Sequence, residues 1–339
     1  MPRGKSIFTP AFSSRLAPTF ARYVDLKRAL GRRFDVPART LENLDRFLCD
    51  QDMKHPDLDA GAFQAWCHTH EHVASGVRRM RMLEVRAFCL YRRRSEPQCF
   101  VPDLNSFPPY HQRLKPYILC EAEIARLLHA ASGLKRCPTS PLRPETIRLA
   151  IILLFTTGIR RRELLNLKIG DYDRQNSTLH IRETKFYKSR VLPIHNGIAD
   201  EIDCYLRTRS QRKFPVVSDS ALLWNPSWGG GAYSATTLRR SIQSLLQECG
   251  IVTTKGTSPR IHDFRHGFAV NALLRWYRAG ADVEAKLPLL ATYLGHGSAV
   301  STHHYLHFIE PLRTASSERF ARHYGALVSS SASLSRRHG

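Results

Sequence analysis

The chain carries six residues that together could cleave a phosphodiester bond without help from a metal ion. Such a reaction needs a nucleophile, positive groups that stabilise a dianion-like phosphorane, and a proton for the leaving oxygen. A guanidinium binds oxyanions bidentately, a lysine can act as the general acid, and histidines supply further donors. A tyrosine hydroxyl can attack phosphorus and hold the cut strand as a covalent ester. In chain order the six residues are Arg160, Lys185, His262, Arg265, His296 and Tyr305.

Their spacing is compatible with one site. His262 and Arg265 are three positions apart, so on a helix both would project from one face. His296 follows Gly295, which is suited to ending a helix, and Tyr305 lies nine residues further on. Each motif alone also has an ordinary structural explanation, such as a surface ion pair, a helix cap or a half-buried phenol. The ordered set favours the catalytic interpretation.

Three segments resemble the motifs of the tyrosine recombinases, also called the phage integrase family. Residues 157–165, Thr-Gly-Ile-Arg-Arg-Arg-Glu-Leu-Leu, are similar to the first arginine motif. The string His-Asp-Phe-Arg-His-Gly-Phe-Ala at 262–269 resembles the second motif, and Leu-Gly-His at 294–296 with Tyr305 resembles the third. The resemblance is specific over residues 117–310 and extends more loosely to the N-terminal helices.

The resemblance implies a mechanism. Tyr305 would attack the scissile phosphate, giving a 3′-phosphotyrosyl link and a free 5′-hydroxyl. Lys185 would protonate the leaving oxygen, with Lys188 as the alternative. No cofactor is implied. The residues that would hold the phosphorane are Arg160, Arg265, His262 and His296.

It also implies a partner, double-stranded DNA with a specific recombination site. Four protomers would assemble on two such sites, and sister recombinases could take part. The net charge of +22 independently favours a polyanionic partner, because lysine and arginine release counterions from phosphates. Residues 1–116 and the remainder are both basic, so a clamp around DNA fits better than a basic tail. Charge alone leaves RNA, a membrane surface or simple solubility open.

Composition limits the other classes. The longest apolar run, residues 149–155, is too short to cross a bilayer, and no apolar segment follows the charged N-terminus. We therefore expect a cytoplasmic, nucleoid-associated protein without a membrane partner. Eight cysteines without a Cys-x-x-Cys pair argue against a disulfide framework or a zinc ribbon. A metal at the Cys-His-Thr-His-Glu-His string of residues 67–72 is disfavoured, because its ligands crowd one short segment.

The predicted fold is mainly α with a small β-sheet. Residues 1–103 are expected to form a helical, SAM-like DNA-clamping domain, and the proline-rich segment 104–116 a linker. Residues 117–328 would form the α+β catalytic domain, and the serine-rich residues 329–339 a disordered tail. A helix at 311–327 would dock on a neighbouring protomer.

Periodicity locates the elements. In the first domain the fourth helix is predicted to present Val77, Met80, Leu83 and Phe88 as its apolar face. In the second domain helices are expected at 119–131, 144–155, 235–248, 262–278 and 287–294, and strands at 178–183 and 190–194. The arginines of the fourth helix in the first domain are interpreted as DNA contacts: Arg78, Arg79, Arg81, Arg86 and Arg92.

Two other functions remain open at this level. A type IB topoisomerase-like enzyme would use similar chemistry without strand exchange, and a regulator could keep the fold but not cut DNA. The presence of all six expected residues disfavours the regulator. A hydrolytic nuclease is disfavoured because no cluster of carboxylates with metal-site character accompanies the basic residues.

Overall fold

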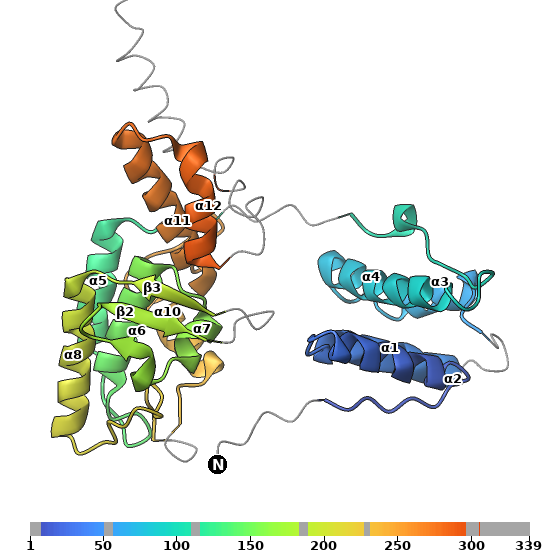
Figure 1. The fold of residues 1–339 in the computed structure, drawn as a ribbon, viewed down its shortest axis with the longest axis horizontal. Coiled ribbons are helices and arrows are strands. Elements are labelled where there is room, and N and C mark those ends of the chain that lie inside the picture. Colours follow the sequence, from blue (N-terminus) through green and yellow to red (C-terminus); the bar gives the residue numbers. More distant parts are fainter. Residues whose placement is uncertain are drawn as a thin grey trace, which may run out of the picture. The chain divides into compact units, whose positions relative to one another are not determined.

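A computed structural model describes residues 8–50, 57–109, 116–182, 189–226, 231–295 and Tyr305. The chain divides into two compact units, Met1–Leu114 and Lys115–Gly339 (Figure 1). The described part is mainly helical with a small antiparallel sheet, which confirms the predicted fold class.

The first unit is a bundle of helices around an aromatic core. Phe20 and Tyr23 on the first helix contact Phe88 on the fourth, with ring centroids 4.2 and 5.7 Å apart. Leu41 and Leu44 are fully buried beside them. The helices of this unit are α1 (Ala17–Ala29), α2 (Asp35–Asp50), α3 (Ala60–His68), α4 (Ser75–Arg92) and the short 3-10 turn η1 (Leu104–Ser106).

The predicted apolar face of α4 was wrong in part. Val77 and Met80 are exposed, and the buried side of the helix is instead formed by Met82, Val85, Phe88, Cys89 and Arg92. A charged residue therefore occupies the inner face. Because Arg92 interrupts the apolar pattern of the buried side, the hydrophobic periodicity of the sequence indicated the wrong face of α4.

The segment expected to be a linker begins inside the first unit. Phe107 is buried in the core of this unit, and Arg79 donates a hydrogen bond to the carbonyl of Pro108 at 2.6 Å. Arg86 likewise donates to the carbonyl of Pro102. Proline cannot donate a backbone hydrogen bond, but its carbonyl still accepts, and the arginines of α4 use these acceptors.

The second unit is built around one helix, α6 (Arg143–Thr157). From residue 149 to 154 it is apolar on all sides, and within the described residues it packs against five other helices of the unit. The further elements are α5 (Glu121–Ser132), α7 (Arg161–Asn166), η2 (Ile169–Asp171), α8 (Asn196–Gln211), α10 (Ala235–Glu248), α11 (Ile261–Arg278) and α12 (Val283–Leu294).

Among the described residues, the sheet of the second unit has three antiparallel strands in the order β1-β2-β3. They are β1 (Tyr172–Asp173), β2 (Thr178–Ile181) and β3 (Arg190–Pro193). Leu179 of β2 pairs with Leu192 of β3, and both side chains are fully buried. The two predicted strands are confirmed, whereas β1 and α8 were not predicted.

Gly158 ends α6 and lets it approach two other helices. Its φ is +58°, in the left-handed region that favours glycine. A Cβ at this position would lie 2.7 Å from Cδ1 of Phe268 and 3.0 Å from Cδ2 of Leu294. The residue type therefore satisfies a backbone requirement and a packing requirement together.

Gly158→Ala is expected to lower the free energy of unfolding by about 2 kcal/mol or more, since it adds backbone strain and a clash. Denaturant unfolding followed by circular dichroism measures this change. Gly133→Ala is the matched control, because Gly133 ends α5 with an ordinary helical φ of −83° and has room for a Cβ. Equal stability of the two variants would contradict the strain argument.

Candidate active site

Arg160 lies at the N-terminus of α7, where Glu163 fixes it. The backbone N–H of Arg160 donates to Oε2 of Glu163 at 3.1 Å, and its Nη1 donates to Oε1 at 2.7 Å. A glutamate at the third helical position commonly closes the first turn in this way. Nη2 of Arg160 donates to the carbonyl of Gly295 at 2.7 Å. The side chain is 33% exposed, so the guanidinium can still reach a ligand.

Arg265 is the buried arginine of the site. It projects from α11, is 2% exposed, and donates from Nη1 to the carbonyl of Gly158 at 2.7 Å. Burial, and then the nearby charge of Arg160, lower its pKa to about 10, so it stays charged at neutral pH. A guanidinium has five N–H donors, so bonds to backbone carbonyls do not exhaust its capacity.

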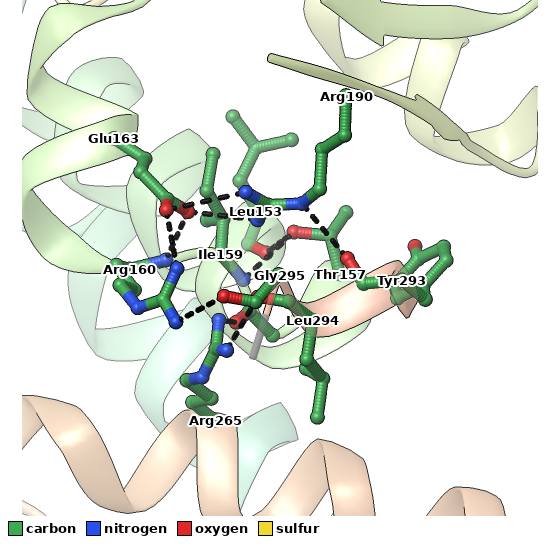
Figure 2. Close-up of polar contacts among 11 residues, drawn as sticks. Leu153, Thr157, Ile159, Arg160, Glu163, Arg190, Arg265, Tyr293, Leu294 and Gly295 are labelled. Carbon is green, nitrogen blue, oxygen red and sulfur yellow. Dashed lines mark hydrogen bonds and ion pairs between the residues drawn. The ribbon is translucent and has the colours of Figure 1, made fainter. Parts of the chain in front are cut away.

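The C-terminal end of α12 is surrounded by arginines (Figure 2). Carbonyls at a helix C-terminus lack helical partners and carry the negative end of the helix dipole, which favours cations. Each of three consecutive carbonyls accepts a hydrogen bond from a different arginine. The pairs are Arg190 Nε with Tyr293 (2.8 Å), Arg265 Nη2 with Leu294 (2.5 Å) and Arg160 Nη2 with Gly295 (2.7 Å).

This arrangement fixes the backbone that leads directly to residue 296. Gly295 has φ +67°, as expected for a helix-ending glycine, so the predicted cap is confirmed. His296 itself lies outside the described residues, as do Lys185 and Lys188. Their predicted roles stay predictions.

Tyr305 is buried at 4% exposure in an apolar cluster formed with α11 and α12. Burial raises the pKa of its phenol, while the charges of Arg265 and Arg160 and a hydrogen bond with Arg265 oppose this rise. The phenol is therefore neutral at rest, and the arginines favour the phenolate as it forms. The structure thus brings together four of the six predicted residues: Arg160, Arg265, Tyr305 and, next to them on α11, His262.

Two histidines of α11 lie beside this group. The ring of His262 contacts that of His266 with centroids 4.6 Å apart, and His266 contacts Tyr305 at 5.4 Å. Partial burial of the ring, followed by the charge of Arg265, lowers the pKa of His262. His262 is consequently neutral at physiological pH and can exchange a proton or a hydrogen bond.

His266 was not singled out from the sequence, although it stands in the second motif. Its Nδ1 is buried without a hydrogen-bond partner among the described residues. Burial, and then the neighbouring His262, lower its pKa to about 4. The other charged groups near it are Asp263, Arg260 and Arg265.

Acidification is expected to destabilise the wild type more than His266→Asn. The folded pKa of His266 is about 4 and the ordinary value is 6.5, so the unfolded chain binds the proton first. Stability is unaffected above the ordinary pKa and falls as the pH drops toward about 4. Between about pH 7 and about pH 5 the extra loss in the wild type is about 2 kcal/mol. Urea unfolding of both proteins at the two pH values measures it, and identical pH dependence would contradict the assignment.

Two ion pairs flank the segment that carries the lysines. At the end of β2, Arg182 Nε pairs with the buried Asp171 at 2.5 Å. At the start of β3, Arg190 pairs with Glu163 at 2.8 Å. The side chain of Arg182 is 66% exposed, whereas that of Arg190 is 11% exposed. Arg190 was missed from the sequence, where it was only part of the Lys-Ser-Arg-Val-Leu-Pro string.

The arginines of α4 differ in their surroundings. Arg92 is buried and pairs with Asp57 at 2.6 Å and with Glu96 at 2.5 Å, so its contacts favour a structural role over DNA contact. Arg79 and Arg86 donate to backbone carbonyls of their own unit, as described above. Arg78 and Arg81 are partly exposed and remain the candidates for contact with a phosphate backbone.

The described residues contain no group of three or more histidines, cysteines, aspartates or glutamates that could hold a metal ion. In the string that suggested one, His70 is buried and its Nδ1 lies 3.0 Å from the carbonyl of Trp66. Within the described ranges, no helix is both long and apolar enough to span a membrane.

Comparison with known proteins shows the family of the chain. A sequence model of the phage integrase family matches residues 118–310. The chain is 33% identical over 286 residues to the putative integrase/recombinase y4rB of Sinorhizobium fredii, covering 84% of this chain and 90% of that protein. It is 30% identical over 210 residues to tyrosine recombinase XerA of Thermococcus kodakarensis, covering 61% and 64%.

Solved structures share the fold. The Tn1549 transposon integrase in complex with transposon right end DNA matches with a TM-score of 0.63 at 15% identity, covering 90% of this chain and 98% of that chain. The XerH recombinase bound to palindromic difH substrate matches with a TM-score of 0.60 at 19% identity, covering 83% and 78%. The fold is therefore that of the tyrosine recombinases and integrases. The chain belongs to the phage integrase family, the tyrosine-type site-specific DNA recombinases.

Proposed function

We propose that Tyr305 is the nucleophile with which this chain breaks and rejoins double-stranded DNA. The observation that carries the proposal is that Tyr305 is buried beside Arg265. Arg265 and Arg160 both donate hydrogen bonds to carbonyls at the C-terminal end of α12, so the two guanidiniums lie in one place. Burial keeps the phenol neutral, whereas the two guanidiniums favour its anion. The same guanidiniums would bind a phosphate, so the phenolate would form next to the phosphorus that it attacks.

The proposed step is a displacement at phosphorus. The oxygen of Tyr305 forms a bond to the scissile phosphorus, and the bond from phosphorus to the 5′-oxygen breaks. Arg160 and Arg265 bind the non-bridging oxygens, whose charge increases in the phosphorane. The neutral His262 is proposed to take up the phenol proton by way of His266, whose ring contacts those of both His262 and Tyr305. Lys185, with Lys188 as the alternative, supplies the proton for the 5′-oxygen, and His296 adds a donor.

The reverse step rejoins DNA. The 5′-hydroxyl of a partner strand attacks the phosphotyrosyl ester and releases Tyr305, so the bond energy is kept without a cofactor. Exchange of strands needs two DNA sites, and we propose four protomers on them, with residues 311–327 docking on a neighbour. Arg78 and Arg81 are proposed to contact DNA phosphates. Such a protein would act at the nucleoid, in the cytoplasm.

The test is covalent capture. A nicked suicide substrate made from DNA flanking the gene loses a short fragment after cleavage, so the covalent complex accumulates. We expect a protein–DNA adduct on a denaturing gel in the presence of a metal chelator, and mass spectrometry should locate the linked nucleotide on the peptide that contains Tyr305. Tight binding without any adduct would favour a non-catalytic DNA-binding regulator. Relaxation of supercoiled DNA without strand exchange would favour a topoisomerase-like enzyme.

A further inference from the structure

Arg190 contacts three separate parts of the site (Figure 2). It belongs to β3, and its Nη1 and Nη2 donate to Oε1 and Oε2 of Glu163 at 3.2 and 2.8 Å. Its Nε donates to the carbonyl of Tyr293 at 2.8 Å. The guanidinium also lies against Gly295, where an added Cβ would come within 2.7 Å of Nη1. One side chain, 11% exposed, thus joins strand β3, the first arginine motif and the end of α12.

The fork geometry makes Arg190 a full partner of Glu163. Two parallel hydrogen bonds between a guanidinium and a carboxylate are the strongest form of this pair. Burial raises the pKa of Glu163, but the hydrogen bond and charge of Arg190, and then those of Arg160, outweigh it and lower the pKa. Glu163 is therefore a fixed negative charge inside the site.

That charge has a consequence for Arg160. If Arg160 were the only partner of Glu163, the two would form a neutral pair, and the arginine would attract a phosphate weakly. With Arg190 added, the three guanidiniums of Arg160, Arg190 and Arg265 and the carboxylate of Glu163 carry a net charge of +2. This charge matches the two negative charges that a phosphorane develops.

The contact with α12 adds a positional effect. The carbonyl of Tyr293 accepts from Arg190, and the carbonyl of Gly295 accepts from Arg160. Both arginines also hold Glu163, so the helix end, the carboxylate and the first arginine form one closed set of hydrogen bonds. Loss of Arg190 would remove its hydrogen bonds to Glu163 and to the carbonyl of Tyr293, and Arg160 would be held less firmly.

We propose that Arg190 is a positioning residue for strand cleavage: it neutralises Glu163, so that Arg160 keeps its charge for the scissile phosphate, and it fixes the end of α12 against Arg160. This role rests on the proposed function. Arg190 does not touch the phosphate itself and acts through Arg160, not through protonation of the leaving oxygen.

The first measurement is the single-turnover rate of adduct formation on the nicked substrate, at saturating protein. Arg190→Gln is expected to slow this rate on the order of 100-fold, because small displacements of a catalytic group carry costs of that size. DNA binding, measured by gel shift, should change little. Arg182→Gln is the matched control next to β2, and it should stay within about threefold of wild type because the Arg182 side chain is 66% exposed and pairs with Asp171, not with Glu163.

Two further measurements separate the proposed role from a loss of packing. Glu163→Gln added to Arg190→Gln removes the charge that Arg190 neutralises, so the double variant should cleave faster than Arg190→Gln alone. A substrate with sulfur in place of the bridging 5′-oxygen has a leaving group that needs no proton. On this substrate the cleavage rate of Arg190→Gln should remain as far below that of the wild type as on the ordinary substrate. The cleavage rate of Lys185→Ala should rise toward that of the wild type.

The outcomes are distinguishable. A wild type that forms no adduct overturns the proposed function and the role of Arg190 with it. If the wild type forms the adduct but no faster than Arg190→Gln, the proposed role of Arg190 is wrong and the proposed function stands. A double variant no faster than Arg190→Gln contradicts charge neutralisation, and recovery of Arg190→Gln on the sulfur substrate shows that the residue acts through the leaving oxygen instead.

Discussion

Tyr305→Phe is expected to abolish the covalent adduct while DNA binding and folding persist. The substitution removes only the phenolic oxygen, which forms the bond to phosphorus in the proposed step. The ring remains to fill the apolar cluster of α11 and α12, where Tyr305 is 4% exposed. No neighbouring group is expected to replace a nucleophile that is held beside both arginines.

The measurement is the amount of adduct on the nicked substrate, with gel-shift binding and thermal unfolding recorded on the same preparations. Tyr293→Phe is the matched control, since it loses the same atom from a tyrosine of α12 whose hydroxyl, among the described residues, makes one long contact of 3.4 Å with the carbonyl of Pro193. It should retain adduct formation within a few-fold. Wild-type levels of adduct in Tyr305→Phe would remove Tyr305 from the mechanism.

Arg265→Lys is expected to slow cleavage by about 10³-fold, or about 4 kcal/mol of transition-state stabilisation. A lysine keeps the charge but cannot present the planar fork, so it cannot bind a phosphate bidentately while holding the carbonyls of Gly158 and Leu294. These carbonyls would lose buried donors. We therefore also expect the free energy of unfolding to fall by about 2 to 4 kcal/mol.

Single-turnover cleavage well below the unfolding temperature of the variant separates the two effects. Arg260→Lys is the control: Arg260 precedes α11 and pairs with Asp263 at 2.9 Å, but its side chain is 47% exposed. A lysine keeps the charge at this exposed position and can still pair with Asp263, so this variant should be nearly normal in stability and rate. Comparable cleavage by both variants would show that Arg265 does not stabilise the reaction.

Much of the fold was predictable because it depends on local properties of the chain. The helices at 235–248, 262–278 and 287–294 were predicted from apolar periodicity, and the structure has them at Ala235–Glu248, Ile261–Arg278 and Val283–Leu294. Gly295 was recognised as a helix end, and its φ is positive. Periodicity and backbone preference are encoded within a few residues, so a single sequence reveals them.

The inner face of α4 was not predictable in the same way. Its stripe contains Arg92, whose burial is stabilised by Asp57 and Glu96. A charge is placed inside a protein only when partners from elsewhere surround it, and periodicity contains no information about such partners. The exposed Val77 and Met80 therefore looked like the core face.

The sequence by itself determined which residue types are available for the chemistry, because a nucleophile, two guanidiniums and their motif order are properties of the chain. Only the tertiary structure decided how they work together. Arg160 and Gly295 are 135 positions apart, and Arg190 and Tyr293 are 103 apart, yet each pair shares a hydrogen bond. Packing of α6, α11 and α12 brings these atoms together, and it gives Arg190 and His266 neighbours that no local pattern specifies.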